Sequence, residues 1–180
     1  MRKQYIPIIG IAVLLAALGI YGLLSRASTT SFTVQQSLAK FTEKDVAVEV
    51  TVEKDQTGQI WLAGTFTPTK PKFHLYSKDL PRTGISGVGR PTLLEVLAPA
   101  DLRPTGSLQA NQPVQDLYLD VLQQTFPVYP DGPVTVRLPI EKPARATMPI
   151  ELAVTYMACS DTTCLAPVEN KRIAATLRSP

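Results

Sequence analysis

The distribution of proline places the strongest limit on what this chain can fold into. All but Pro7 of the 16 prolines lie between Pro68 and Pro180, and their spacing leaves no room for a long helix. A proline inside a helix removes a backbone hydrogen bond and clashes with the preceding turn, so the helix bends or ends there. The chain beyond Pro68 is therefore expected to form short strands and loops.

Apolar and polar residues alternate along several segments, as they do in half-buried β-strands. The apolar positions of five such runs are Val46, Val48, Val50 and Val52; Ile60, Leu62 and Phe66; Val134, Val136, Leu138 and Ile140; Ile150, Leu152, Val154 and Tyr156; and Ile173, Ala175 and Leu177. Short strands joined by turns predict an all-β fold, an immunoglobulin-like antiparallel β-sandwich. The connection over residues 98–116 has no clear period.

The N-terminal segment differs from the rest because it is continuously apolar. Tyr5–Leu24 contains no charged residue and is long enough, at about 1.5 Å per residue, to cross a hydrocarbon core of about 30 Å as one transmembrane helix. Arg2 and Lys3 precede it, which places the N-terminus in the cytoplasm and the remaining chain outside. A cleaved signal peptide is the alternative, since residues 25–27 are compatible with a cleavage site.

This segment sets the expected domain organisation. We expect a cytoplasmic stub and signal-anchor over residues 1–27, a tether over 28–44, and one β-sandwich domain over 45–180. Arg2, Lys3 and Arg26 account for the net charge of +3, so the chain from Ser28 onward is neutral. Without a basic excess to neutralise phosphates, nucleic acid is not an expected partner.

Both cysteines, Cys159 and Cys164, lie in the segment YMACSDTTCLAP at the end of the fourth alternating run. A disulfide persists in the oxidising space outside the cytoplasm. The four intervening residues form a hairpin loop of common length, which places the pair at bonding distance. In the alternation of residues 150–158, Cys159 falls opposite the apolar face, so its side chain should point away from the core.

The spacing alone leaves the role of this bond open. Closing so short a loop stabilises a fold by only about 2 kcal/mol, whereas a disulfide on a surface hairpin is accessible to an attacking thiolate. A structural disulfide and a redox pair that opens and closes are both consistent with the sequence. A copper(I) site made by the cysteines with Met157 and His74 is a third alternative.

Four segments resemble, in order and approximate spacing, the N-terminal periplasmic domain of the DsbD family of thiol:disulfide interchange proteins. The most specific holds Tyr156, the two cysteines around a short polar loop, and a nearby proline. The segments are FHLYSKDL (73–80), GRPTLLEV (89–96), FPVYPDGPVTVRLPI (126–140) and VTYMACSDTTCLAPVENKRI (154–173). The resemblance covers about residues 41–178 and implies an immunoglobulin-like domain in the bacterial periplasm, held at the inner membrane by residues 5–24.

By this resemblance Cys159 and Cys164 are the redox pair, and His74 and Tyr76 match a segment whose aromatic side chains lie near it. The pair would receive electrons from a thioredoxin-like or multi-span membrane donor. It would pass them to periplasmic thioredoxin-fold proteins that serve disulfide isomerisation or cytochrome c biogenesis. Full-length family members carry their donor domains on the same chain, whereas this chain ends at Pro180, so we expect its donor on another polypeptide.

The family also has a cap loop that shields the disulfide until a partner docks. Leu119–Gln124 matches this loop. Asp120 matches an acidic position within it, whereas Leu122 stands where the family usually has an aromatic residue. Asp120 and Leu122 are therefore expected to shield the pair together with His74 and Tyr76.

Thiol exchange proceeds through a mixed disulfide and requires neither a metal nor a cofactor, so we expect none. Two functions follow from the sequence. The first is a membrane-anchored domain that relays electrons through its cysteine pair. The second is a non-catalytic immunoglobulin-like interaction domain with a structural hairpin disulfide.

Overall fold

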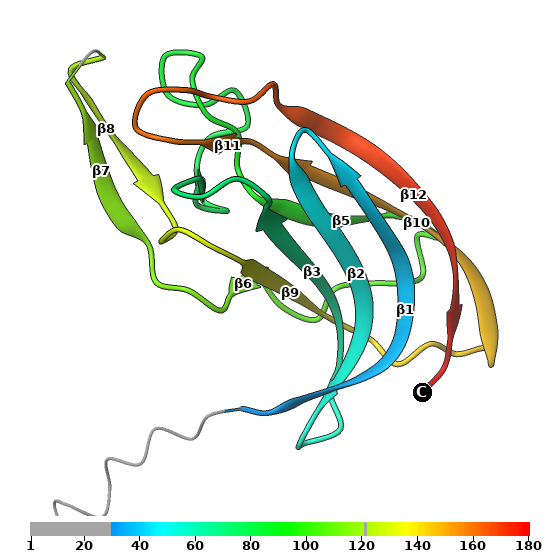
Figure 1. The fold of residues 1–180 in the computed structure, drawn as a ribbon. Coiled ribbons are helices and arrows are strands. Elements are labelled where there is room, and N and C mark those ends of the chain that lie inside the picture. Colours follow the sequence, from blue (N-terminus) through cyan, green and yellow to red (C-terminus); the bar gives the residue numbers. More distant parts are fainter. Residues whose placement is uncertain (1–29, 121) are drawn as a thin grey trace, which may run out of the picture. The chain divides into compact units, whose positions relative to one another are not determined.

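β-Strands make up the regular structure of the computed structural model, which describes residues 30–120 and 122–180 (Figure 1). The strands are β1 (Phe32–Glu43), β2 (Val46–Asp55), β3 (Ile60–Pro68), β4 (His74–Leu75), β5 (Leu93–Ala98), β6 (Gln109–Ala110), β7 (Gln115–Leu119), β8 (Gln124–Val128), β9 (Val134–Ile140), β10 (Thr147–Tyr156), β11 (Ala158–Cys159) and β12 (Val168–Arg178). They form a five-stranded sheet of order β1-β2-β3-β9-β6, a three-stranded sheet of order β12-β10-β5, and the pairs β11-β4 and β7-β8. Every one of these strand pairings is antiparallel.

The all-β antiparallel prediction is therefore confirmed for the described part of the chain, where no residue is helical. The predicted transmembrane helix at residues 5–24 lies outside the described residues. Within residues 30–120 and 122–180, no helix has the length and apolar character needed to cross a membrane.

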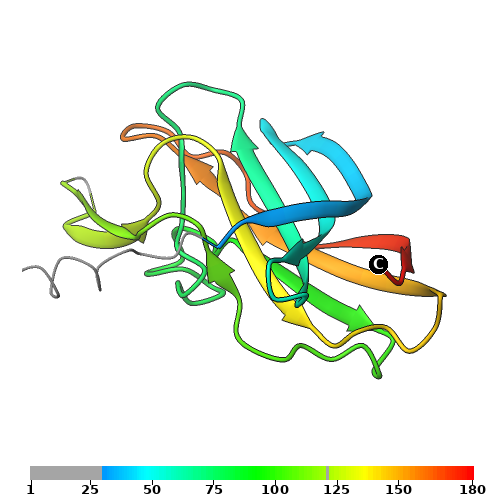
Figure 2. The same ribbon diagram turned by 90° about the horizontal axis from the view of Figure 1, so that it is seen from below.

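The main core lies between the two larger sheets (Figure 2). Alternation decides which side chains enter it: Val48 and Val50 of β2 are buried, whereas Glu49 between them is only half-buried. The opposite sheet contributes Ile150, Leu152 and Val154 of β10. Burying each such side chain contributes about 1.5–3 kcal/mol, so the alternation read from the sequence is what holds the two sheets together.

Within the segment expected to be a tether, residues 28–44, strand β1 occupies Phe32–Glu43. β1 pairs with β2 along its length as the edge of the larger sheet. The connecting turn has only two residues, Lys44 and Asp45, with φ values of 50° and 53°, as a type I′ hairpin requires. In the described part of the chain, β-structure therefore begins at β1 and not at residue 45.

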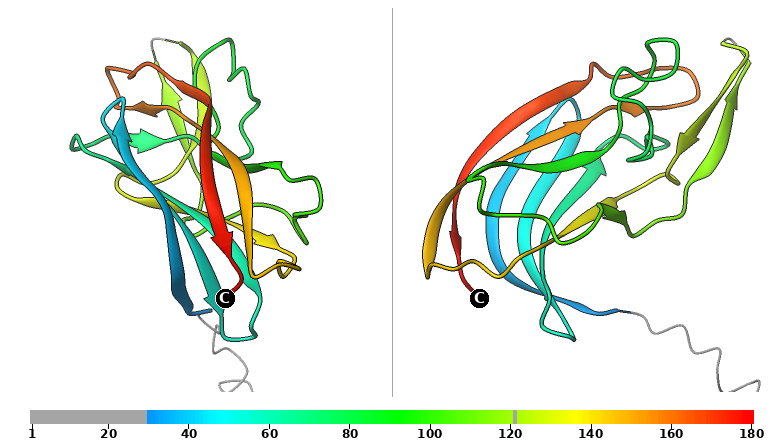
Figure 3. Two further views of the ribbon diagram at one scale, coloured as in Figure 1. Left: turned by 90° about the vertical axis from the view of Figure 1, so that its right-hand side faces the viewer. Right: turned by 180° about the vertical axis from the view of Figure 1, so that it is seen from behind.

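The cysteine segment lies where the chain leaves the smaller sheet. β10 continues past Met157 into β11, which pairs with β4. Tyr76, directly after β4, forms isolated bridges with Pro91 and with Val128 at the end of β8. As a result β11, the β4–β5 connection and the β7–β8 hairpin gather at the same end of the domain (Figure 3).

Candidate functional site

The expected hairpin disulfide is present at this end of the domain. Cys159 and Cys164 are bonded with an S–S distance of 2.05 Å and a Cα–Cα distance of 4.1 Å. Ser160 organises the intervening turn, since its amide donates to the carbonyl of Thr163 at 2.8 Å and its hydroxyl accepts from the Thr163 amide at 3.1 Å. Serine is favoured in such turns because its hydroxyl bonds to nearby backbone. The amide of Leu165 then donates to the carbonyl of Ala158 at 2.9 Å, which closes the hairpin.

The two sulfurs lie in different environments. Cys164 is exposed, whereas Cys159 is only 1% exposed. Cys159 does point away from the main core, as its position in the alternation predicts, because Ala158 before it enters that core. The face it points to is nevertheless closed. A second apolar cluster covers it, formed by Cys159 with Tyr76, Leu80, Phe126 and Val128.

Tyr76 contacts the buried sulfur directly. Its hydroxyl donates to Cys159 Sγ at 3.2 Å, and its ring packs edge-on against Phe126 with centroids 5.9 Å apart. The hydroxyl of Thr92 donates to the Tyr76 carbonyl at 2.8 Å and fixes the backbone there. Burial raises the pKa of Tyr76 to about 12, so the phenol keeps its proton at neutral pH and remains a hydrogen-bond donor.

His74 lies on the strand that pairs with Cys159. It stands directly opposite Cys159 in the β4–β11 pair, and its ring packs edge-on against Tyr76 with centroids 5.9 Å apart. The side chain is 4% exposed, and its Nε2 atom is buried without a hydrogen-bond partner. Burial lowers the pKa of His74, and the negative charges of Asp131 and Asp161 oppose that effect.

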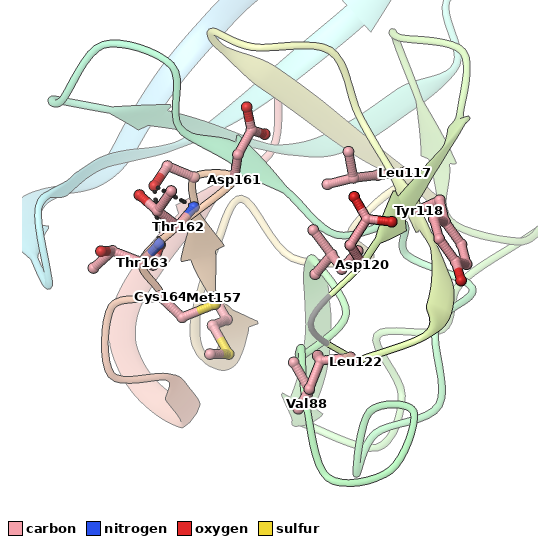
Figure 4. Close-up of a pocket in the computed structure, with 12 residues that line it drawn as sticks. Val88, Leu117, Tyr118, Asp120, Leu122, Met157, Asp161, Thr162, Thr163 and Cys164 are labelled. Atoms are coloured by element: carbon pink, nitrogen blue, oxygen red, sulfur yellow. Dashed lines mark hydrogen bonds between the residues drawn. The ribbon is translucent and has the colours of Figure 1, made fainter.

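A groove of about 790 Å³ runs beside the exposed sulfur (Figure 4). The disulfide hairpin and Met157 form one wall, and Val88 with the β7–β8 hairpin forms the other. The groove is mainly apolar, with the carboxylates of Asp120 and Asp161 on opposite walls. The β7–β8 hairpin contributes Leu117, Leu119 and Leu122 to the lining. The disulfide hairpin contributes Thr162 and Cys164. An apolar side chain of a docking protein could enter this groove next to Cys164.

The structure places the predicted site residues in two groups. His74 stands opposite Cys159 in the β4–β11 pair, and the Tyr76 hydroxyl contacts the Cys159 sulfur. Asp120 and Leu122 lie in the turn between β7 and β8, across the groove from Cys164 (Figure 4). Leu122 is 44% exposed and Cys164 is exposed, so in this conformation Asp120 and Leu122 face the disulfide without covering it.

Sequence reasoning missed several residues that complete the site. Val88 and Leu117 line the groove together with Met157, which the sequence suggested only as a copper ligand, and Phe126 supports the ring of Tyr76. The alternation of Leu117 and Leu119 within QDLYL is the signal that could have placed a strand there. No local signal identifies Val88, because it reaches the groove only through the course of the long β4–β5 connection.

Comparisons with known proteins include a structural likeness. No model of a protein family matches the sequence, and no curated protein matches it. Among solved structures, the fold is similar to the crystal structure of the N-terminal periplasmic domain of ScsB from Proteus mirabilis, with a TM-score of 0.49 and 11% sequence identity. The match covers 77% of this chain and 50% of that chain, so this chain spans half the length of the solved structure.

Proposed function

We propose that this chain is a thiol-disulfide interchange domain that relays electrons through Cys159 and Cys164 to thioredoxin-fold proteins. The observation that carries the proposal is the inequality of the two sulfurs: Cys164 is exposed at a groove, and Cys159 is buried beneath a tyrosine hydroxyl. The Tyr76 hydroxyl, 3.2 Å from Cys159 Sγ, provides a hydrogen bond to the thiolate that forms there when the disulfide opens. The sequence resemblance to the DsbD family supports the same function and an immunoglobulin-like topology.

The geometry gives the exchange a direction. A thiolate of the donor attacks the exposed Cys164 sulfur, and the electron pair of the breaking S–S bond moves to Cys159, whose thiolate accepts the Tyr76 hydrogen bond. The donor's second thiolate then attacks the donor sulfur of the mixed disulfide and releases Cys164. The donor pair is oxidised to a disulfide, and this pair becomes a dithiol with the protons that the donor thiols gave up. An oxidised acceptor is reduced by the same steps in reverse.

The compartment and the partners of this reaction are proposed from the sequence. We place the domain in the bacterial periplasm, anchored to the inner membrane by residues 5–24, with a thioredoxin-like or multi-span membrane protein as its donor. The apolar groove beside Cys164 supports docking of such partners, because it offers both contact area and access to the sulfur. No observation on the described residues favours the non-catalytic alternative over this one.

The first part of the test asks whether the disulfide opens in the folded domain. The compact unit Ser31–Pro180 is equilibrated in glutathione buffers of increasing reducing power. Alkylated cysteines are counted by mass while circular dichroism monitors the fold. We expect both cysteines to become alkylated with the β-structure intact. A bond that stays closed until the domain unfolds would refute the relay.

The second part asks which sulfur is attacked. Cys159→Ala leaves the exposed Cys164 as the sole thiol, and we expect it to accumulate a mixed disulfide with a thioredoxin-fold protein in cells. Cys164→Ala is the matched control, because it leaves only the buried Cys159 and should trap far less. More adduct with Cys164→Ala than with Cys159→Ala would reverse the proposed direction.

A further inference from the structure

His74 is a buried polar group that the exchange described so far does not use. It is the only histidine of the chain, and its Nε2 atom is buried without a hydrogen-bond partner. Nearly all buried polar side-chain atoms in proteins are hydrogen-bonded, and an exception needs an explanation. A catalytic role is one such explanation, because the partner of the polar atom then appears only during the reaction.

The position of His74 indicates what that partner is. His74 and Cys159 are directly opposite in an antiparallel pair, so their side chains leave the same face of the two strands. Tyr76, two residues further along on the same face, packs against the His74 ring and donates to Cys159 Sγ. The imidazole therefore belongs to the cluster around the one sulfur that acquires negative charge when the disulfide opens.

We propose that His74 is the proton donor to Cys159 during reduction of the disulfide, an inference that rests on the proposed function. The attacking thiolate bonds to Cys164 Sγ, the S–S bond breaks, and its electron pair moves to Cys159 Sγ. Cys159 takes the proton of the His74 imidazolium, which becomes neutral imidazole. The solvent later returns a proton to His74, so the exchange leaves the histidine unchanged.

The charges around His74 favour this role. Asp131, between β8 and β9, and Asp161, in the disulfide turn, both favour the imidazolium, although burial lowers the pKa of His74 overall. Tyr76 stays neutral because its pKa is raised to about 12, and Lys72, the nearest cation along the chain, is exposed. His74 is therefore mainly neutral at neutral pH, and the fraction able to donate a proton grows as the pH falls.

The experiment measures how fast excess 2-mercaptoethanol opens the disulfide of the full chain between pH 5 and pH 8. Each rate is divided by the thiolate concentration, so that titration of the reagent is removed. We expect the corrected rate of the wild type to rise toward acid pH by about tenfold or more, since a positioned acid typically accelerates a reaction by factors of about 10² to 10⁴. In His74→Gln, which has a polar side chain without a transferable proton, the corrected rate should not vary with pH.

Asp131→Asn provides a second variant at an exposed position, and it tests the proposal even if His74→Gln fails to fold. Removing this negative charge lowers the pKa of His74, so the acid rise should remain but move to lower pH. A wild-type rate that does not vary with pH, a rise retained in His74→Gln, or an unshifted rise in Asp131→Asn would overturn the role of His74 and leave the relay standing. A disulfide that opens in no variant without unfolding would overturn the relay itself.

Discussion

Single residues around the disulfide make its two sulfurs chemically unequal. The Tyr76 hydroxyl lies 3.2 Å from Cys159 Sγ and 3.9 Å from Cys164 Sγ, so it stabilises negative charge on the buried sulfur more than on the exposed one. A thiol-disulfide exchange proceeds faster when the departing thiolate is stabilised. The two effects thus act together. The Tyr76 hydroxyl favours Cys159 as the departing thiolate, and the burial of Cys159 makes Cys164 the sulfur that is attacked.

Replacing Tyr76 with phenylalanine should slow the opening of the disulfide by about tenfold or more, because a hydrogen bond to a charged group contributes about 1.5–3 kcal/mol. The ring contacts with His74 and Phe126 are retained. Tyr118→Phe is the matched control, since Tyr118 is 52% exposed and points away from the disulfide hairpin (Figure 4). The measurement is the rate of reduction by dithiothreitol at pH 7. Equal rates in the two variants would contradict the role of the Tyr76 hydroxyl.

The part of the site that could be predicted from the sequence is local. The spacing of Cys159 and Cys164 predicts their bond, and the alternation predicts that Cys159 leaves the main core. Burial of Cys159 could not be predicted, because Leu80 and Phe126, which cover it, are distant in sequence. The pairing of His74 with Cys159 depends on a ladder of two residues, which is too short to produce a periodic pattern.

At the scale of strands and connections, predictability follows the regularity of each element. β2, β3, β9, β10 and β12 carry apolar residues at alternate positions, and this pattern predicts them. β1 was not predicted, because two register shifts along its pairing with β2 break the alternation and its turn uses Lys44 and Asp45 instead of the Asn-Gly type that marks such hairpins. The β4–β5 connection shows no periodic pattern of apolar residues, yet its residues Gly89 and Thr92 contact Tyr76 and help to position it.

Gly89 in the β4–β5 connection is where this positioning can be tested. It has a φ of +82°, and a Cβ there would lie 2.9 Å from the Tyr76 ring and from Leu80. Gly87 has a φ of +83° with nothing within 4 Å of such a Cβ. Alanine at either position costs about 1–2 kcal/mol for the left-handed backbone, but only Gly89→Ala should move the Tyr76 ring away from Cys159.

We therefore expect both alanine variants to lose stability in urea unfolding, Gly89→Ala more than Gly87→Ala because its Cβ also crowds Tyr76 and Leu80, while only Gly89→Ala slows disulfide opening, by several-fold. Gly87→Ala serves as the control for the backbone penalty, since it leaves the space around Tyr76 unchanged. Slowing of the same size in both variants would show that general loosening of the connection, and not the position of Tyr76, controls the reaction.

At the scale of the whole domain, β1 joins the two sheets at their edge. It pairs with β2 in the larger sheet, and its Gln36 side chain reaches β12 in the smaller one. The Gln36 amide donates to the Thr176 carbonyl at 2.7 Å, and its side-chain oxygen accepts from the Arg178 amide at 2.9 Å. β1, the strand farthest from the disulfide in sequence, thus helps to hold the smaller sheet in place. β10 of that sheet leads directly into β11 and the cysteines.

Two fragments test whether β1 belongs to the folded unit. Residues 31–180 include the strand, and residues 45–180 match the domain expected from the sequence. The shorter fragment loses the partly buried Leu38 and Phe41, and side chains of this kind contribute up to about 1.5–3 kcal/mol each when fully buried. For a domain of this size such a loss lowers the melting temperature by roughly 10 °C.

We expect thermal unfolding by circular dichroism to show this decrease, and Gln36→Ala in the longer fragment to show a smaller one. Equal melting temperatures for the two fragments would mean that the sandwich is complete without β1 and that the expected boundary at residue 45 describes the stable domain.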